Sequence, residues 1–346
     1  MYSLETLSDF NFEISSHCNS KCPQCPRYDQ MGRVQKNLNV THLDVDLIRQ
    51  LPIDQMPNLK HVTLCGNFGD PLMHPQLNDI IDIFSKQKIL ISTNASLRGT
   101  NWWSNLGKNK NVTVTFCIDG IGEVHEYYRR NTSYEKIMNN AKAFIDAGGT
   151  ALWQYIVFKH NEHQIEEVKK ISLEMGFKNV EFIYSDRFDT ANKWRVYEDG
   201  NYLYDLEKSS TQTTLREYLG SKNNDKYWKE LYKGKGEISC VWSKNKKLYI
   251  HSDGCVYPCC MLGSIQTGKN IEKLMLKKLI RNFDYINLHK NSLGDILNSN
   301  VYNDILPKSF EGDPFQHPIC VEWCNKNTGR IAFKDLNKVN TDRQIS

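Results

Sequence analysis

The most informative part of the chain reads Glu13-Ile14-Ser15-Ser16-His17-Cys18-Asn19-Ser20-Lys21-Cys22-Pro23-Gln24-Cys25. It places three cysteines on one loop with the spacing Cys-x3-Cys-x2-Cys, directly after a predicted strand. Thiolates bind iron–sulfur clusters, and a complete 4Fe–4S site normally takes four of them. Three thiolates leave one iron open, which is typical of a catalytic metal centre. The alternative is a structural zinc site with a distant fourth ligand such as His17.

Short apolar runs alternate with amphipathic segments around and after this loop. The predicted strands are Asn11–Ser16, His61–Cys65, Ile89–Thr93, Val112–Ile118, Ala151–Phe158 and Val180–Tyr184. Helical periodicity is found in Gln76–Ser85, Tyr134–Ala147 and Gln164–Met175. Such alternation implies parallel strands joined by right-handed crossovers. The six units predict the α/β class with a partial (β/α)6 barrel, and an open doubly wound sheet is the alternative.

The pattern changes after about residue 187, where the chain becomes polar up to residue 238. We expect a core barrel over residues 1–190, a connector or variable cap over 191–237, a small α+β domain over 238–330 and a tail over 331–346. Within these parts the sequence predicts a hairpin from Leu248–His251 and Val256-Tyr257, and helices near Thr211–Leu219, Ile271–Asn282 and Leu293–Ile305.

Composition indicates a reducing, cytoplasmic setting and gives no sign of nucleic acid as a partner. The 44 basic and 40 acidic side chains leave a net charge of only +4, so no basic footprint is present. No apolar run approaches the ~20 residues that cross a bilayer, and Met1–Phe10 lacks the features of a secretory signal. Disulfides rarely persist in the cytoplasm, so the eleven cysteines indicate metal sites.

The cysteine loop and its placement after the first strand resemble the radical S-adenosylmethionine (SAM) superfamily, over residues 11 to about 186. The resemblance implies a 4Fe–4S cluster bound by Cys18, Cys22 and Cys25, with SAM chelated at the open iron. It also implies that one electron, from a partner such as flavodoxin or ferredoxin, cleaves SAM to a 5′-deoxyadenosyl radical that abstracts hydrogen from an organic substrate. The cofactor supplies the difficult chemistry, and the protein supplies orientation and exclusion of water.

Motifs after the later strands resemble the SAM-binding segments of this superfamily. Leu64–Leu72 is similar to the Gly-Gly-Glu-Pro segment, although Phe68 replaces a glycine and Asp70 replaces the glutamate. The resemblance implies cofactor contacts by Gly69, Asp70, Pro71, Ser92, Thr93, Asn94, Asp119, Arg130, Gln154 and Val157. The alternatives are a surface role for Arg130 and core packing for Val157.

A second set of cysteines lies in the last third of the chain. The pattern Cys240-x13-Gly254-x4-Cys259, followed by Cys320-x3-Cys324, resembles the SPASM and twitch auxiliary domains of radical SAM enzymes. Because four cysteines fit, the twitch form with a single auxiliary 4Fe–4S cluster is the closer match. Cys255 or Cys260 could replace Cys259, and a zinc-ribbon-like site is the alternative.

The resemblance implies an oxidoreductase-like enzyme acting on a small or medium organic substrate. An auxiliary cluster favours an oxidation, dehydrogenation or radical bond-forming step. A peptide-modifying maturase is one alternative, with a peptide as substrate. An epimerase is another, with Cys117 returning a hydrogen atom, although a buried cysteine also packs as a small hydrophobe. A non-catalytic zinc-binding scaffold protein is the alternative from a different class.

Overall fold

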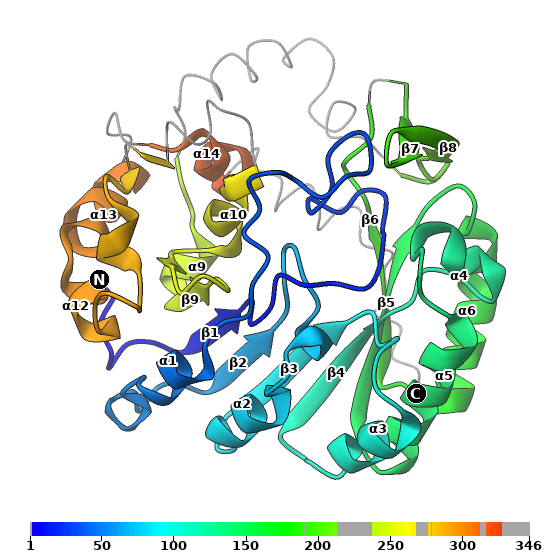
Figure 1. Ribbon diagram of the computed structural model, residues 1–346, viewed down its shortest axis with the longest axis horizontal. Coiled ribbons are helices and arrows are strands. Elements are labelled where there is room, and N and C mark those ends of the chain that lie inside the picture. The colour runs from blue at the N-terminus through cyan, green and yellow to red at the C-terminus, as the bar shows by residue number, and fades with distance from the viewer. Residues whose placement is uncertain are drawn as a thin grey trace. The chain divides into compact units, whose positions relative to one another are not determined.

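A computed structural model describes residues 2–189, 191–212, 237–267, 276–277, 279–311 and 316–326 (Figure 1). The chain divides into two compact units. The first unit combines Met1–Ile14, Thr41–Val62 and Thr213–Leu336, and the second combines Ser15–Val40, Thr63–Gln212 and Asn337–Ser346. Each unit contains one of the two sets of cysteines, so the two candidate metal sites are described separately.

Four parallel strands form the centre of the second unit. They are β3 (Lys88–Thr93), β4 (Val112–Cys117), β5 (Thr150–Val157) and β6 (Asn179–Tyr184), paired in chain order. The helices and turns of this unit are η2 (Pro71–Met73), α2 (Leu77–Ile83), α3 (Thr100–Gly107), α4 (Glu123–Tyr128), α5 (Tyr134–Asp146), η3 (Glu162–Gln164) and α6 (Ile165–Met175). Strand–helix alternation with parallel pairing confirms the α/β class that the sequence predicts.

An aromatic core holds the helices of this unit against the strands. The ring of Trp103 on α3 lies 5.1 Å from that of Phe116 on β4, and Phe116 lies 5.9 Å from Phe144 on α5. All three side chains are fully buried. Burial of such large side chains contributes a major share of the hydrophobic stabilisation and fixes the strands whose carboxyl ends carry the site.

The segment predicted as a connector or cap contains an antiparallel hairpin, β7 (Lys193–Glu198) and β8 (Asn201–Glu207). Val196 and Leu206 of this hairpin are buried and pack in one hydrophobic cluster with Cys22. Few side chains of this hairpin are buried, and the others are partly or fully exposed. The alternation of buried and exposed residues that is typical of a strand is therefore limited to a few positions. Polar composition therefore hid the strands from sequence reasoning.

The first unit contains β1 (Asp9–Phe12), β9 (Lys247–Ile250) and β10 (Val256–Tyr257). β9 pairs parallel with β1 and antiparallel with β10, which confirms the predicted hairpin. The strand β2 (His61–Leu64) lies at the boundary between the units. The remaining elements of the first unit are α1 (Val45–Arg49), η1 (Ile53–Gln55), α9 (Val241–Lys244), α10 (Cys260–Gly263), η4 (Ser264–Thr267), η5 (Phe283–Ile286), α12 (Leu293–Asn298), η6 (Val301–Ile305), α13 (Leu306–Phe310) and α14 (Pro318–Cys324).

Apart from the β7–β8 hairpin, predicted and observed elements differ at two places, the predicted helix Leu293–Ile305 and the first strand. The predicted helix is interrupted at Ser299, whose extended backbone separates α12 from η6. The first strand is shorter than predicted. It ends at Phe12 and does not run to Ser16, because the Ile14 carbonyl accepts a hydrogen bond from the amide of Leu43 and no longer follows the ladder. The predicted tail over 331–346, most of the predicted helix Thr211–Leu219 and half of the predicted helix Ile271–Asn282 lie outside the described residues. Among the helices that are described, none has the length and hydropathy to span a membrane.

Candidate functional site: a three-cysteine loop and a second cysteine cluster

The loop that carries Cys18, Cys22 and Cys25 is tied to its surroundings through its backbone. The amide of Cys25 donates to the Cys22 carbonyl at 3.1 Å, which makes a tight turn. The amide of Lys21 donates to the carbonyl of Arg130 at 2.9 Å. These contacts hold the three thiols on one short, well-anchored segment.

Polar donors lie next to two of the three sulfurs. The hydroxyl of Ser20 lies 3.0 Å from Cys22 Sγ, and Arg129 Nη1 donates to the same sulfur at 3.7 Å. The side-chain amide of Asn94 donates to Cys18 Sγ at 3.8 Å. Donors of this kind stabilise thiolates, which are the form that binds iron. Burial raises the pKa of Cys25 to about 11, and a thiol gives up its proton when it becomes a metal ligand. The residues therefore fit an iron–sulfur cluster.

The Gly69–Asp70 turn joins the cysteine loop to the end of β3. A Cβ added to Gly69 would lie 1.9 Å from the carbonyl oxygen of Ser15, so this close approach requires glycine. The buried carboxylate of Asp70 accepts hydrogen bonds from Thr93 Oγ1 at 2.8 Å and from the amide of Asn94 at 2.8 Å. Burial raises the pKa of Asp70, whereas these donors oppose that shift. Four of the predicted SAM-binding residues are thus brought together, with Asp70 bonded to protein groups.

A second group of predicted residues lies in a row across β3, β4 and β5. Cys117 Sγ is 3.6 Å from Ser92 Oγ and 3.9 Å from Gln154 Oε1. Burial raises the pKa of Cys117, which keeps its S–H bond at neutral pH, as a hydrogen donor requires. Val157 is fully buried in the ladder between β5 and β6.

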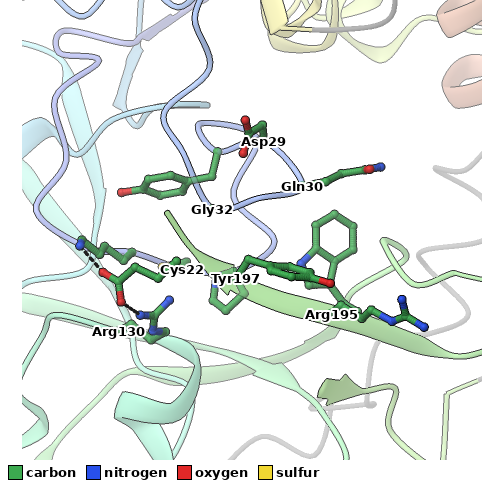
Figure 2. A pocket seen from close by; sticks show the side chains of 12 residues that line it. Cys22, Asp29, Gln30, Gly32, Arg130, Arg195 and Tyr197 are labelled. Atoms are coloured by element: carbon green, nitrogen blue, oxygen red, sulfur yellow. Dashed lines mark hydrogen bonds and ion pairs between the residues drawn. The ribbon is translucent and has the colours of Figure 1, made fainter. Parts of the chain in front are cut away.

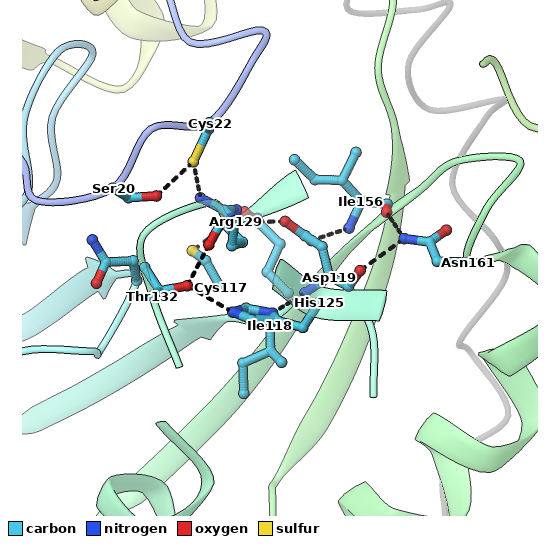
Figure 3. A network of polar contacts seen from close by, with 12 residues as sticks. Ser20, Cys22, Cys117, Ile118, Asp119, His125, Arg129, Thr132, Ile156 and Asn161 are labelled. Carbon is cyan, nitrogen blue, oxygen red and sulfur yellow. Dashed lines mark hydrogen bonds and ion pairs between the residues drawn. The ribbon is translucent and has the colours of Figure 1, made fainter. Parts of the chain in front are cut away.

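A buried ion pair that sequence reasoning missed lies beside Cys22 (Figure 3). Arg129 Nε donates to Asp119 Oδ2 at 2.5 Å, and the Asp119 side chain is 0% exposed. Arg129 and Arg130 are adjacent in the sequence, and only the contacts that each makes in the fold distinguish them. Arg130 pairs instead with Glu198 of β7.

The same glutamate also pairs with Lys21 of the cysteine loop. These three charged side chains lie on the wall of a pocket between the loop and β7, which Cys22 also lines. Figure 2 shows the pocket with the bonds from Glu198 to Lys21 and Arg130. The hairpin is thus bonded to the segment that carries the first set of thiols.

The first unit brings together Cys240, Cys259, Cys320 and Cys324. The Cys324 thiol hydrogen-bonds to Cys240 and lowers the pKa of Cys240 below its usual value. Burial raises the pKa of Cys259 to about 12, with a further contribution from Cys240. The pKa of Cys320 is raised by burial and by the neighbouring charges of Cys259 and Cys240. These four are the thiols that the sequence pattern selects.

The contacts of Cys255 differ from those of the four thiols. Its sulfur accepts a hydrogen bond from Asn287 Nδ2 at 3.3 Å. All eleven cysteines of the chain are free thiols in the structure. Within the described ranges, no group of three or more His, Cys, Asp or Glu side chains is arranged to hold a single metal ion.

Comparisons with known proteins agree with this division of the cysteines. Residues 12–171 match the sequence model of the radical SAM superfamily. Residues 240–326 match the SPASM model, which describes an iron–sulfur cluster-binding domain. A cysteine-type anaerobic sulfatase-maturating enzyme of Clostridium novyi (strain NT) is 23% identical over 359 aligned positions, covering 94% of this chain and 89% of that protein.

Solved structures share the fold at low sequence identity. SuiB of Streptococcus suis bound to S-adenosylmethionine has a TM-score of 0.55 and 16% identity, with 90% of this chain and 72% of SuiB covered. Native anSMEcpe with bound AdoMet has a TM-score of 0.55 and 16% identity, with 88% of this chain and 84% of that chain covered. The two domain matches imply a SAM-binding 4Fe–4S cluster and auxiliary iron–sulfur ligation. The chain is a radical SAM superfamily enzyme with a C-terminal SPASM domain.

Proposed function

We propose that this enzyme oxidises a residue of a peptide or protein substrate. The similarity to the sulfatase-maturating enzyme of Clostridium novyi supports a substrate of this size, because it extends over 94% of the chain. The fold is also similar to that of SuiB in its complex with the precursor peptide SuiA, at a TM-score of 0.55. A peptide substrate is therefore preferred over the small or medium organic substrate that the sequence favoured.

In this proposal Cys18, Cys22 and Cys25 hold the cluster whose open iron binds SAM. When bound and reduced, this group supplies a 5′-deoxyadenosyl radical that abstracts one hydrogen atom from substrate. The protein keeps water away from the reacting atoms, because Thr93, Asn94 and Cys117 are buried at the ends of β3 and β4. Exclusion of water prevents the side reactions of reactive species.

The single observation that supports an oxidation as the reaction is the second group of thiols. Cys240, Cys259, Cys320 and Cys324 influence one another electrostatically, and in this proposal they supply the four thiolates that a fully ligated 4Fe–4S cluster takes. Removal of one hydrogen atom leaves one electron on the substrate, which must leave together with a proton to complete an oxidation. A fully ligated cluster is suited to accept that electron, and the net loss from the substrate is two hydrogen atoms.

The proposal is tested with a library of synthetic Cys- and Ser-containing peptides, incubated anaerobically in D₂O with reconstituted enzyme, SAM and dithionite. We expect 5′-deoxyadenosine and a peptide product that lacks two hydrogen atoms, both detected by mass spectrometry. The triple variant Cys18→Ala, Cys22→Ala, Cys25→Ala serves as the control and should form neither product.

Other outcomes of this experiment select other functions. A peptide that takes up one deuterium atom without oxidation indicates epimerisation, with the exchangeable S–D of Cys117 as the donor. Stimulation of 5′-deoxyadenosine by a library of small organic molecules, with none by peptides, contradicts the proposed substrate class. A colourless protein that binds zinc and never cleaves SAM would contradict the proposal that this chain is a SAM-cleaving enzyme.

A further inference from the structure

Arg129 presents a positive charge to one particular sulfur of the cysteine loop. Its Nη1 lies 3.7 Å from Cys22 Sγ, while its Nε donates to Asp119 Oδ2 at 2.5 Å (Figure 3). The arginine side chain is 15% exposed and the aspartate side chain 0%. The guanidinium therefore stands between the carboxylate and the thiol, with its N–H groups directed at both.

Asp119 is fixed by backbone groups and in turn fixes the arginine. Its second carboxylate oxygen accepts a hydrogen bond from the amide of Ile156 at 2.6 Å. Its own amide donates to His125 Nδ1 at 3.1 Å, and its carbonyl accepts from Asn161 Nδ2 at 2.9 Å. Burial lowers the pKa of His125 to about 3, so the ring stays neutral and Nδ1 remains an acceptor. Rotation of the carboxylate away from Arg129 would break the bond from Ile156, and the two backbone bonds fix the residue that carries the carboxylate.

The contacts of the other nearby arginines differ. Arg27 donates to the carbonyls of Ser16 and Phe68, and Arg187 donates to the carbonyl of Gln24. Both charges act on Cys25 through space. Arg130 pairs with Glu198. Among the described contacts, Arg129 is the arginine whose guanidinium meets a thiol of the loop directly.

The physical consequence concerns the electron that the cluster must accept. One-electron reduction makes the cluster and its thiolates more negative. A cation and an N–H donor at a ligand sulfur stabilise the reduced form more than the oxidised form, and hydrogen bonds to the sulfurs set the potentials of such clusters. The effect is large in a buried site, where the effective dielectric constant is low.

We propose that Arg129, positioned by Asp119, raises the reduction potential of the cluster held by the cysteine loop. The inference rests on the proposed ligation of that cluster by Cys22. It assigns to the Asp119–Arg129 pair a role in accepting the electron. Asp119 acts through the arginine and is a positioning residue.

The test is a redox titration of the reconstituted enzyme with dithionite, followed by the paramagnetic resonance of the reduced cluster. SAM is omitted, so that a contact between Arg129 and the cofactor cannot contribute. In Arg129→Met the ratio of reduced to oxidised cluster, at the wild-type midpoint, should fall about tenfold, which is a shift of about 59 mV for one electron. Arg129→Lys keeps the charge and should shift less.

Arg130→Met is the matched control, because it removes the same charge from the neighbouring position, where the guanidinium meets Glu198 and not a sulfur. In Arg130→Met the ratio of reduced to oxidised cluster, at the wild-type midpoint, should change less than threefold. The inference is wrong if Arg129→Met holds a full cluster and titrates like the wild type, or if both variants shift equally. Should Arg129→Met fail to hold the cluster, Arg129→Gln carries the same expectation of a lower potential.

Failure of the proposed cluster ligation is seen separately. If Cys22→Ala retains the wild-type iron content and resonance, Cys22 is not a ligand and the ligand set is wrong, whatever the arginine variants do. If Cys22→Ala loses the cluster while Arg129→Met titrates normally, the ligation stands and only the role of Arg129 is rejected.

Discussion

At the scale of single residues, Gly69 determines how closely two segments of the site approach. A Cβ at this position would lie 1.9 Å from the carbonyl oxygen of Ser15 and 2.7 Å from Ser16 Cα. Both atoms belong to the backbone immediately before the cysteine loop, so no flexible side chain can move aside. The glycine therefore sets the distance between the Asp70 turn and the loop.

We expect Gly69→Ala to push the backbone at Ser15 away and to reduce the iron content of reconstituted enzyme at least several-fold. Gly99→Ala is the matched control, because an added Cβ there meets nothing within 4 Å. Iron and sulfide analysis, together with 5′-deoxyadenosine formation, measures the effect. Equal iron content in the two variants would show that the loop tolerates the displacement.

At the scale of elements, the β7–β8 hairpin is attached to the cysteine loop by several different contacts. Glu198 pairs with Lys21, and the amide of Gly200 donates to the carbonyl of Met31 at 2.9 Å. Trp194 packs on the hydrophobic cluster that contains Cys22. Partly exposed ion pairs contribute only about 0–1 kcal/mol each, so their role is local order more than global stability.

Glu198→Gln should therefore leave the thermal midpoint nearly unchanged and increase amide hydrogen exchange in residues 18–32. Glu207→Gln is the control, since Glu207 pairs with Lys193 inside the hairpin, at 3.3 Å. Hydrogen exchange of the anaerobic enzyme, read by mass spectrometry, distinguishes the two. Unchanged protection of the loop in Glu198→Gln would mean that the remaining contacts suffice to hold it.

At the scale of the whole molecule, the two sets of cysteines belong to separate compact units. In the first unit, two contacts join the segments that flank the four thiols. Ile238 and Asn325 form a β-bridge, and the amide of Ser239 donates to the Cys324 carbonyl at 2.8 Å. These bonds join the two ends of the SPASM match. Each thiol group therefore depends on its own local structure.

Replacing both Cys320 and Cys324 by alanine should spare SAM cleavage and abolish net oxidation of substrate. The expected result is 5′-deoxyadenosine at about the wild-type rate, with the oxidised peptide reduced at least tenfold. Circular dichroism checks that the variant is folded. Equal loss of both products would indicate a purely structural role for the second thiol group.

Local patterns explain why much of the fold could be predicted. The apolar runs of β3, β4, β5 and β6 are short, rich in β-branched residues and separated by amphipathic helices, so each element is encoded within its own segment. The β7–β8 hairpin was missed because its polar strands are stabilised by contacts with distant residues such as Cys22 and Lys21.

The sequence by itself determined the chemistry available to this protein. The spacing of Cys18, Cys22 and Cys25, and that of the C-terminal cysteines, specifies which thiols are near one another along the chain. Only the tertiary structure decided that Arg129, and not Arg130, faces Cys22, and that Asp70 is bonded to Thr93 and Asn94. The direction of a side chain depends on packing and hydrogen bonds between segments far apart in the sequence, and no local pattern encodes these.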